Sequence, residues 1–344
     1  MKTHREKLLH HLGTIFGAVM FAVAVYVLYH ELGKQPLGDV LAEFRKLSVF
    51  DVLLALGFTA GAYVAMLGIE KLAVRYIEED VSWRRALLVS FLANTFAHNA
   101  TGIAGTAVRF RLYRAWRVPR AEVTIVVGFI ALTFWLGFLT LAGIDFIIEP
   151  LSIPPAIHLW FSTARPLGTV FLGILLAYLT FTVSRIRPVR VFGKHLPIPL
   201  WWLSALQMAF SAAEWCLAGA VFYAVIPLPS NLSFPMFLGM FMLARIAGNV
   251  SHVPGGLGVF DSLMLIMLED TVPASAAIGG LLAFRGIFYL LPLVPAAVML
   301  VVYEGRLKRA RRERMRLEAQ AERQQCLLND DDKPAEPMQR QRTR

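Results

Sequence analysis

The sequence predicts an all-α polytopic membrane protein with about six full transmembrane helices, two opposed re-entrant broken helices and an inverted-topology repeat. The first observation is composition: 57% of the 344 residues are hydrophobic and 17% are charged, and the mean hydropathy is +0.57. The second is a series of charge-free stretches of about 18 residues or more, which is enough to cross a hydrocarbon core about 30 Å thick. The third is a pair of glycine-rich interruptions in apolar segments. Helices are expected because lipid offers backbone amides no partner, and a helix satisfies them within one segment.

Six apolar segments have the length of full spans: residues 12–29, 52–69, 121–147, 167–183, 200–226 and 273–303. The first follows a basic N-terminus, as the apolar part of a signal peptide does. It is long, however, and it ends at His30 and Glu31 without a cleavage site of small residues. We therefore expect an uncleaved first helix.

Two further apolar segments, residues 86–108 and 234–268, are interrupted in the middle by polar residues and glycines. The first contains His98, Asn99, Thr101, Gly102 and Gly105, and the second contains Asn249, Ser251, His252, Pro254, Gly255, Gly256 and Gly258. A continuous membrane helix rarely tolerates such a cluster, whereas a broken helix that is buried in protein or lines a cavity does. The glycines at 255, 256 and 258 permit a tight turn and exposed amides at a half-helix N-terminus, which is a local anion site. The predicted hairpin glycines are Gly102, Gly105, Gly255, Gly256 and Gly258.

Charge placement predicts how these segments cross, because basic residues concentrate on the cytoplasmic side. Basic residues precede the first span and follow the second, so the N-terminus and residues 70–85 should be cytoplasmic. A full crossing of the first broken segment would leave five arginines outside: Arg109, Arg111, Arg114, Arg117 and Arg120. A hairpin from the cytoplasmic side avoids this conflict. Acidic residues alone, Glu269 and Asp270, follow the second broken segment, which indicates a hairpin from the outer side. Both termini are then cytoplasmic; eight full crossings are the alternative.

An internal repeat supports the same layout. A shift of 151 residues places Leu92 on Leu243 and Gly105 on Gly256, and it lays the first three spans on the last three. Because the partners run in opposite directions, the halves form an inverted repeat, the plan of many secondary transporters. We expect a membrane domain at residues 1–304, with repeats at about 8–150 and 160–304. Residues 305–344 should be a basic, disordered cytoplasmic tail.

Ionisable residues within membrane segments are costly and are candidates for function. Four lie near the broken segments: Glu214, Arg245, Asp261 and Arg285. They either form ion pairs that lock helices together or line a polar cavity for lipid headgroups. The remaining candidates lie in the breaks or directly after the first hairpin: His98, Asn99, Arg109, Arg111, Asn249 and His252. Guanidinium groups suit phosphate, but arginines there also set topology, and buried His and Asn often serve only as structural hydrogen-bonding residues.

Several chemistries are excluded or unsupported. Residues 252–261 are rich in glycine but have no Gly-Lys-Ser/Thr ending and follow no strand, so they are not a nucleotide-binding P-loop. No zinc-ligand spacing, nucleophile elbow or dinucleotide fingerprint is present, so we expect no metal, no cofactor and no catalytic domain. Seven of the eleven residues from Arg306 to Arg316 are basic. Nothing beside them resembles a groove-reading module, so anionic headgroups and not nucleic acid are the expected partner.

Three motifs resemble the membrane domain of bacterial lysylphosphatidylglycerol synthases: AVRFRLYRAW at 107–116, LTFWLG at 132–137 and SHVPGGLGVFD at 251–261. The resemblance covers roughly residues 10–305 and implies a bacterial cytoplasmic (inner) membrane protein. In the full-length synthases this domain is regarded as a flippase for aminoacylated phosphatidylglycerol. Asp261 stands where the resemblance leads us to expect a glutamate. The synthases also carry a soluble aminoacyl-transferase domain, and the roughly forty polar residues after Tyr303 are too few to form one.

The leading hypothesis is therefore a stand-alone, non-enzymatic lipid translocase that moves or binds a phospholipid or related anionic headgroup between the opposed hairpins. The alternative is a non-transporting membrane partner that recruits a separate lipid-modifying enzyme. An intramembrane enzyme that uses Glu214 or Asp261 is the weakest hypothesis, because no paired-carboxylate or metal-binding spacing supports it.

Overall fold

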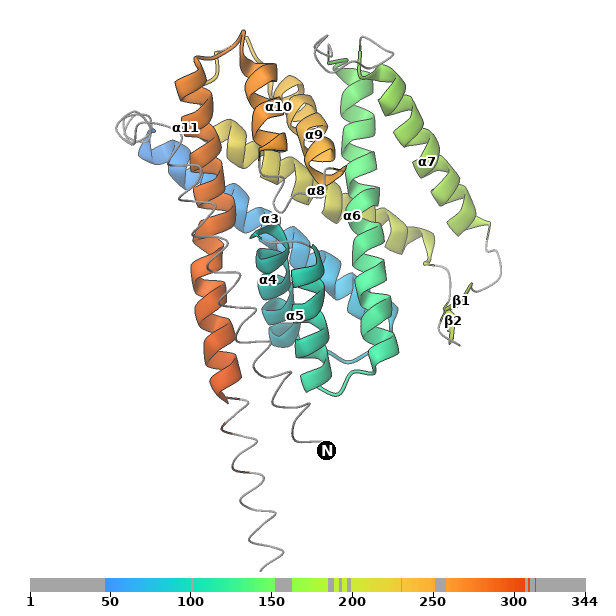
Figure 1. The fold of residues 1–344 in the computed structure, drawn as a ribbon. Coiled ribbons are helices and arrows are strands. Elements are labelled where there is room, and N and C mark those ends of the chain that lie inside the picture. The colour runs from blue at the N-terminus through green and yellow to red at the C-terminus, as the bar shows by residue number, and fades with distance from the viewer. Residues whose placement is uncertain are drawn as a thin grey trace, which may run out of the picture. The chain divides into compact units, whose positions relative to one another are not determined.

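The computed structural model describes residues 47–99, 102–151, 163–184, 189–191, 194–196, 199–229, 231–250, 258–306, 309 and 313 (Figure 1). Within these residues, five helices are long and apolar enough to span a membrane: α3 (Val49–Tyr76), α6 (Arg120–Ile148), α7 (Arg165–Val183), α8 (Trp201–Val225) and a helix from Ala274 to Arg306. The last consists of α11 (Ala274–Phe284), the π-helix η3 (Arg285–Leu290) and a continuation to Arg306. These helices confirm the polytopic all-α class and five of the six predicted spans. The predicted first span, residues 12–29, lies outside the described residues.

The chain's own contacts divide it into two units, Met1–Ala296 and Ala297–Arg344. All packing and site geometry below belongs to the first unit. The short strands β1 (Val189–Val191) and β2 (Lys194–Leu196) pair antiparallel between α7 and α8, with Arg190 opposite His195. This pair of strands was not predicted from the sequence.

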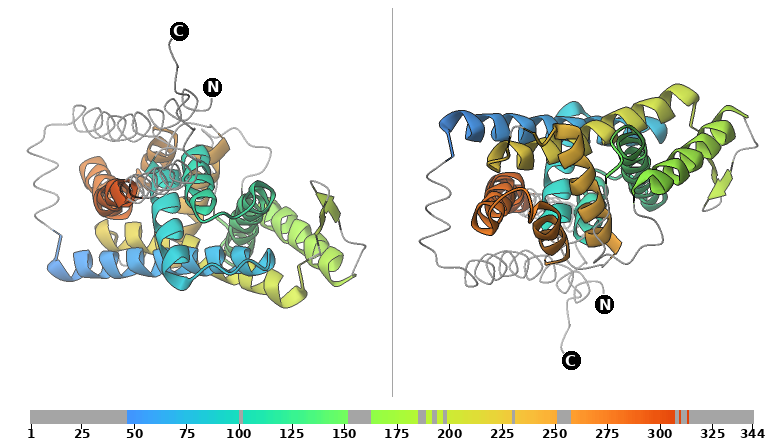
Figure 2. Two further views of the ribbon diagram at one scale, coloured as in Figure 1. Left: turned by 90° about the horizontal axis from the view of Figure 1, so that it is seen from below. Right: turned by 90° about the horizontal axis from the view of Figure 1, so that it is seen from above.

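Helices α3 and α8 pack side by side and in opposite directions. Figures 1 and 2 show the pair lying across the direction of α6 and α11. The close approach depends on glycine, because a Cβ built on Gly68 of α3 would lie 2.7 Å from the Phe210 ring of α8. Small residues at helix contacts are the usual means of tight packing in membranes. α3 begins at a capping box, in which Phe50 N–H donates to Ser48 Oγ and Ser48 N–H donates to the Asp51 carboxylate.

The first broken segment forms two short helices, α4 (Trp83–Asn99) and α5 (Gly102–Ala115). At 1.5 Å per residue they are about 26 and 21 Å long, so neither crosses a core of about 30 Å. The Arg85 guanidinium lies 5.3 Å from the ring centre of Trp116, so the start of α4 is beside the chain that leaves α5. The segment thus returns to the side from which it came, as predicted for a re-entrant hairpin.

The second broken segment forms α9 (Phe234–Val250) and α10 (Val259–Leu268), which pack against each other. In Figure 1 the α4–α5 pair lies toward the lower end of α6 and the α9–α10 pair toward its upper end. This is the predicted opposed arrangement. The shift of 151 residues lays α4 onto residues 234–250, which are the bounds of α9, and it lays α3 within two residues of the bounds of α8. The inverted repeat is therefore expressed in the helices themselves.

Candidate functional site at the meeting point of the hairpins

Tyr289 of η3 connects the ends of both first half-helices. Asn99, the last residue of α4, donates through Nδ2 to the Tyr289 carbonyl (3.0 Å) and to the Thr95 carbonyl (2.9 Å). Arg245, near the end of α9, donates through Nη1 to the Tyr289 hydroxyl (2.6 Å). The end of α4 and the C-terminal part of α9 thus meet at one residue. We call the group of His98, Asn99, Glu214, Arg245, Asn249 and Tyr289 the central polar cluster.

Three nitrogen atoms of this cluster are buried and have no hydrogen-bond partner among the described residues: His98 Nε2, Arg245 Nε and Asn249 Nδ2. Buried polar groups in folded proteins are nearly always hydrogen-bonded, so each exception requires an explanation. The His98 ring packs between Phe288 and Tyr289, at centroid distances of 5.5 and 6.0 Å. The aromatic packing accounts for the ring but not for its nitrogen.

Arg245 sits in an aromatic cage. Its Cζ lies 5.3 Å from the ring centre of Trp215, 5.6 Å from that of Phe260 and 5.9 Å from that of Phe241. Ring faces attract a cation, and this contribution is larger where water is excluded. Glu214 directly precedes Trp215 in α8. It is buried and interacts electrostatically with Arg245. No ion pair joins these two side chains, or Arg245 to any other described carboxylate, within 4 Å.

Arg109 is placed differently from the expected surface position. It is only 5% exposed, and its Nε and Nη2 lie 3.0 and 2.9 Å from Oε2 of Glu70, which is fully buried. Nη2 also donates to Asn94 Oδ1 (3.0 Å), and the Tyr113 hydroxyl donates to Glu70 Oε1 (2.7 Å). We call this group the α5–α3 latch, because it joins the second half-helix of the first hairpin to a full span. A role of Arg109 in receiving a headgroup stays a prediction, as does that of Arg111, which is exposed.

A second ion pair holds the second hairpin. Arg285 donates to both oxygens of Asp261, with Nη2 to Oδ2 at 2.6 Å and Nε to Oδ1 at 3.1 Å. Asp261 Oδ2 also accepts the backbone N–H of Gly258 (2.9 Å), which has φ +79° and begins α10. This α10–α11 latch fits the ion-pairing alternative that the sequence left open for these charges. Each side chain is 13% exposed.

The π-helix has a local cause in the sequence. Pro292 and Pro295 have no N–H, so the carbonyls four residues earlier lose their α-helical hydrogen bonds and the rings crowd the preceding turns, although the helix continues through both residues to Arg306. The chain adopts the wider π pattern over Arg285–Leu290 directly before them. Such insertions into α-helices occur frequently at functional sites. Here the π-helix carries Arg285 of the latch and Tyr289 of the central polar cluster.

Some predicted site residues cannot be placed, and some site residues were not predicted. His252, Gly255 and Gly256 lie outside the described residues. Gly105 packs against α4, where a Cβ would lie 2.5 Å from the Ala93 carbonyl oxygen, whereas nothing lies within 4 Å of a Cβ on Gly102. Glu70, Asn94, Tyr113 and Tyr289 were not predicted from the sequence. The signal for Glu70 was weak because a carboxylate at the end of a span is ordinarily solvated.

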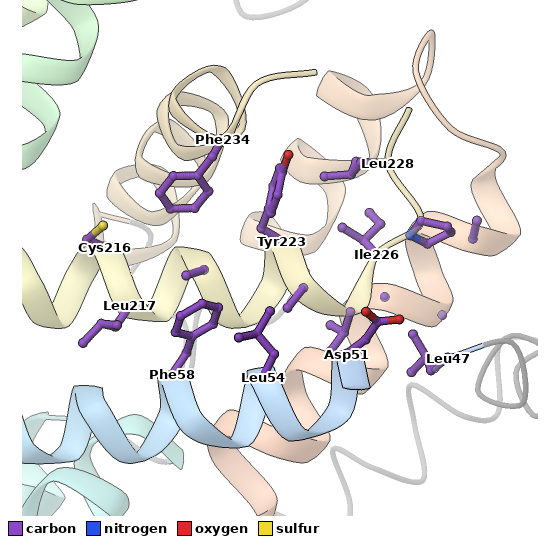
Figure 3. Close-up of a pocket in the computed structure, with 17 residues that line it drawn as sticks. Leu47, Asp51, Leu54, Phe58, Cys216, Leu217, Tyr223, Ile226, Leu228 and Phe234 are labelled. Carbon is purple, nitrogen blue, oxygen red and sulfur yellow. The ribbon is translucent and has the colours of Figure 1, made fainter. Parts of the chain in front are cut away.

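An apolar cleft of about 710 Å³ lies away from the central polar cluster, between the start of α3, the end of α8 and the starts of α9 and α11. Figure 3 shows Asp51 and Leu47 toward one end of it and Cys216 toward the other. Tyr223 lines the cleft, and its hydroxyl donates to the Leu232 carbonyl (3.2 Å). None of the predicted site residues lines this cleft.

Comparisons with known proteins show which family the chain is similar to. Residues 14–296 match the family model described as the lysylphosphatidylglycerol synthase TM region. The chain is 34% identical over 301 residues to Uncharacterized protein slr0712 of Synechocystis sp., covering 87% of this chain and 92% of that one. It is 28% identical over 299 residues to Inner membrane protein YbhN of Escherichia coli, covering 85% and 92%.

A phosphatidylglycerol lysyltransferase of Staphylococcus haemolyticus is 26% identical over 307 residues, and the match covers 86% of this chain but 34% of that enzyme. The similarity is thus confined to about a third of the enzyme. The bacterial inner-membrane location expected from the sequence is confirmed, while the orientation of the termini stays a prediction. With its helical spans, opposed hairpins and matching sequence, the chain belongs to the lysylphosphatidylglycerol synthase transmembrane family.

Proposed function

We propose that the protein is a lipid translocase that receives a phospholipid, or a related anionic lipid, by its headgroup at the central polar cluster. The observation that carries the proposal is the set of three buried nitrogen atoms, on His98, Arg245 and Asn249, that find no hydrogen-bond partner in the part of the chain that the structure describes. Two of these nitrogens, on the Arg245 guanidinium and the Asn249 amide, can act only as hydrogen-bond donors, and phosphate oxygens are strong acceptors. The acyl chains would remain in lipid, so the protein needs to shield only the headgroup.

Charge supports Arg245 as the residue that meets the phosphate. Arg109 and Arg285 each have a carboxylate within 3 Å, from Glu70 and Asp261 respectively. Among the described residues Arg245 has no such ion pair, and its hydrogen bond goes to the neutral Tyr289 hydroxyl. Among the described interior arginines, Arg245 is thus the one without a carboxylate in direct contact, so a phosphate can bind it directly.

The inverted repeat suggests how access alternates. The two hairpins enter from opposite ends, and each is held to a full span by its own latch, while Tyr289 joins their inner ends. Movement of one repeat against the other about a fixed central site is the general scheme for such folds. The relatives named as phosphatidylglycerol lysyltransferases favour phosphatidylglycerol or a derivative as the lipid.

The test is leaflet-resolved movement of a fluorescent phospholipid in vesicles that contain the purified full-length protein. Wild type should move the probe faster than protein-free vesicles. Arg245→Gln should lose roughly tenfold or more, because a hydrogen bond to a charged group contributes about 1.5–3 kcal/mol and 1.4 kcal/mol is a factor of ten. Arg245→Lys should restore part of the rate, and Arg165→Gln, at an exposed arginine at the start of α7, is the matched control. Equal rates with and without protein for every candidate lipid would refute the proposal.

A second candidate is a non-transporting membrane partner for a separate lipid-modifying enzyme. It is favoured by three basic side chains held over tryptophan rings where α3, α4 and α8 begin or end: Lys71 on Trp83, Arg85 on Trp116 and Arg75 on Trp202. Together with the basic tail they would form its docking surface. Crosslinking in cells with residues 305–344 present or deleted discriminates between the candidates, since lipid movement that survives deletion favours the translocase.

A further inference from the structure

Asp145 is a buried carboxylate that the proposed headgroup site does not use. It lies one turn before the end of α6 and is 6% exposed. Its Oδ2 is fully buried and has no hydrogen-bond partner among the described residues. Within those residues no arginine, lysine or histidine forms an ion pair with it, in contrast to Glu70 and Asp261.

The carboxylate faces the second hairpin. A Cβ built on Gly239 of α9 would lie 2.7 Å from Asp145 Oδ2, so the oxygen rests against the backbone of α9 at a position without a side chain. Arg245 and Asn249 follow on the same helix, about 9 and 15 Å further along at 1.5 Å per residue. A change at Asp145 therefore acts directly on the helix that carries two residues of the central polar cluster.

The described surroundings offer Asp145 Oδ2 neither a cation nor a hydrogen-bond donor. Among the described residues, Glu149, just beyond the end of α6, and Cys216 of α8 are titratable groups that interact with Asp145. On α9 the residue that faces Asp145 is Gly239, which also lies near the Phe146 ring. Phe146 in turn packs on Phe171 of α7, with 6.2 Å between the ring centres. An ionised carboxylate without a partner is costly in such surroundings, whereas the acid is neutral and gains an O–H donor.

We propose that Asp145 is a proton-binding site whose occupancy sets the packing of α9 against α6. The step is the addition of H⁺ to the carboxylate to give the carboxylic acid. The acid packs against α9 at Gly239, and loss of the proton leaves a charge that must seek water, which displaces α9. On the predicted topology this end of α6 faces the outer side, so the proton arrives from outside.

The apolar cleft shares one residue with the surroundings of Asp145. It is lined by Cys216, the α8 residue with which Asp145 interacts, and Figure 3 shows its other end beside Asp51 at the start of α3. If lipid is moved as proposed above, this site couples that movement to a proton gradient. Only this last step rests on the proposed function.

The first experiment measures the proton itself. Infrared difference spectra of the full-length protein in lipid nanodiscs, recorded between pH about 4 and 9 where perturbed carboxyl groups titrate, should contain a protonated-carboxyl band. The band should be absent in Asp145→Asn and present in the control Asp270→Asn, which changes an exposed carboxylate after α10. A spectrum unchanged by Asp145→Asn overturns the proton site, whatever the lipid assay gives.

The second experiment measures α9. Spin labels at Ile148 of α6 and Met236 of α9, both exposed, in a Cys216→Ala, Cys326→Ser background should report a pH-dependent change of about 1–2 Å, the size of helix shifts at interfaces. Asp145→Asn should abolish the pH dependence, and the control Asp270→Asn should retain it. A pH response that persists in Asp145→Asn overturns the coupling to α9.

Lipid movement under an imposed pH gradient separates the two proposals. Wild type should respond to the gradient, and Asp145→Asn should move lipid at a gradient-independent rate. If no lipid moves in any preparation while the infrared and distance signals behave as stated, the translocase proposal fails and the proton site stands. If lipid moves equally with and without the gradient in wild type, the coupling fails and the translocase stands.

Discussion

Replacing Glu70 by glutamine tests the α5–α3 latch. Glu70 is fully buried, and its two oxygens accept from Arg109 Nε (3.0 Å) and from the Tyr113 hydroxyl (2.7 Å), with Arg109 Nη2 at 2.9 Å from Oε2. Glutamine keeps the shape but removes the charge and turns an acceptor into an NH₂ donor that faces other donors. The Arg109 guanidinium is then buried without its counter-charge, which costs about 3–5 kcal/mol.

The assay is thermal unfolding of the purified protein in one detergent, followed by tryptophan fluorescence. A cost of 3–5 kcal/mol corresponds to a fall in Tm of roughly 6–20 °C at about 2–4 °C per kcal/mol, the scaling for soluble domains of 150–250 residues. Asp80→Asn, at an exposed carboxylate between α3 and α4, is the matched control and should leave Tm unchanged.

A double-mutant cycle isolates the pair. Arg109→Met should also destabilise the protein, because Glu70 then keeps only the Tyr113 hydroxyl as donor. Glu70→Gln combined with Arg109→Met should cost less than the two single changes together, since no buried charge is left unpaired. Additive changes, or a Glu70→Gln variant as stable as Asp80→Asn, would refute the reasoning.

Two further changes probe the hairpins. Gly105→Ala places a Cβ 2.5 Å from the Ala93 carbonyl oxygen and should destabilise the protein by about 1–3 kcal/mol through overpacking. A Cβ at Gly102 meets no atom within 4 Å, so the stability of Gly102→Ala should lie within about 1 kcal/mol of that of wild type. Equal Tm values for the two variants would contradict this reasoning. Tyr289→Phe removes the acceptor of Arg245 Nη1 but keeps the carbonyl, so lipid movement in the vesicle assay should fall while Tm changes by no more than a few degrees. An unchanged rate would exclude the hydroxyl from the site.

The positions of the breaks were predictable from local chemistry. Polar residues and glycines in an apolar segment leave backbone groups that lipid cannot satisfy, so the helices end there: α4 ends at Asn99 and α9 at Val250. The charge pair of Asp261 and Arg285 was also within reach of sequence reasoning, because both charges interrupt apolar stretches and charges of opposite sign reduce each other's desolvation cost.

Partners across the fold were not predictable in the same way. Glu70 lies at the end of its span, where a carboxylate is ordinary, and Arg109 is 39 residues away, so no local pattern joins them. Tyr289 is one aromatic residue in an aromatic-rich span. Asp145 did carry a signal, a carboxylate near the end of a long apolar segment, but its contact with Gly239 depends on how α6 and α9 pack.

The π-helix at Arg285–Leu290 also bears on how the two halves of the chain are aligned. A π turn closes its hydrogen bond over one residue more than an α turn, so it holds one additional residue in the same stretch of helix. Before it, residues 151 apart occupy equivalent positions, as the bounds of α4 and α9 show. Beyond Leu290 the equivalent residue should be 152 positions away. Superposition of α6 on the final helix therefore requires a single-residue gap at η3, and the halves depart from two-fold symmetry at the turn that contacts both hairpins.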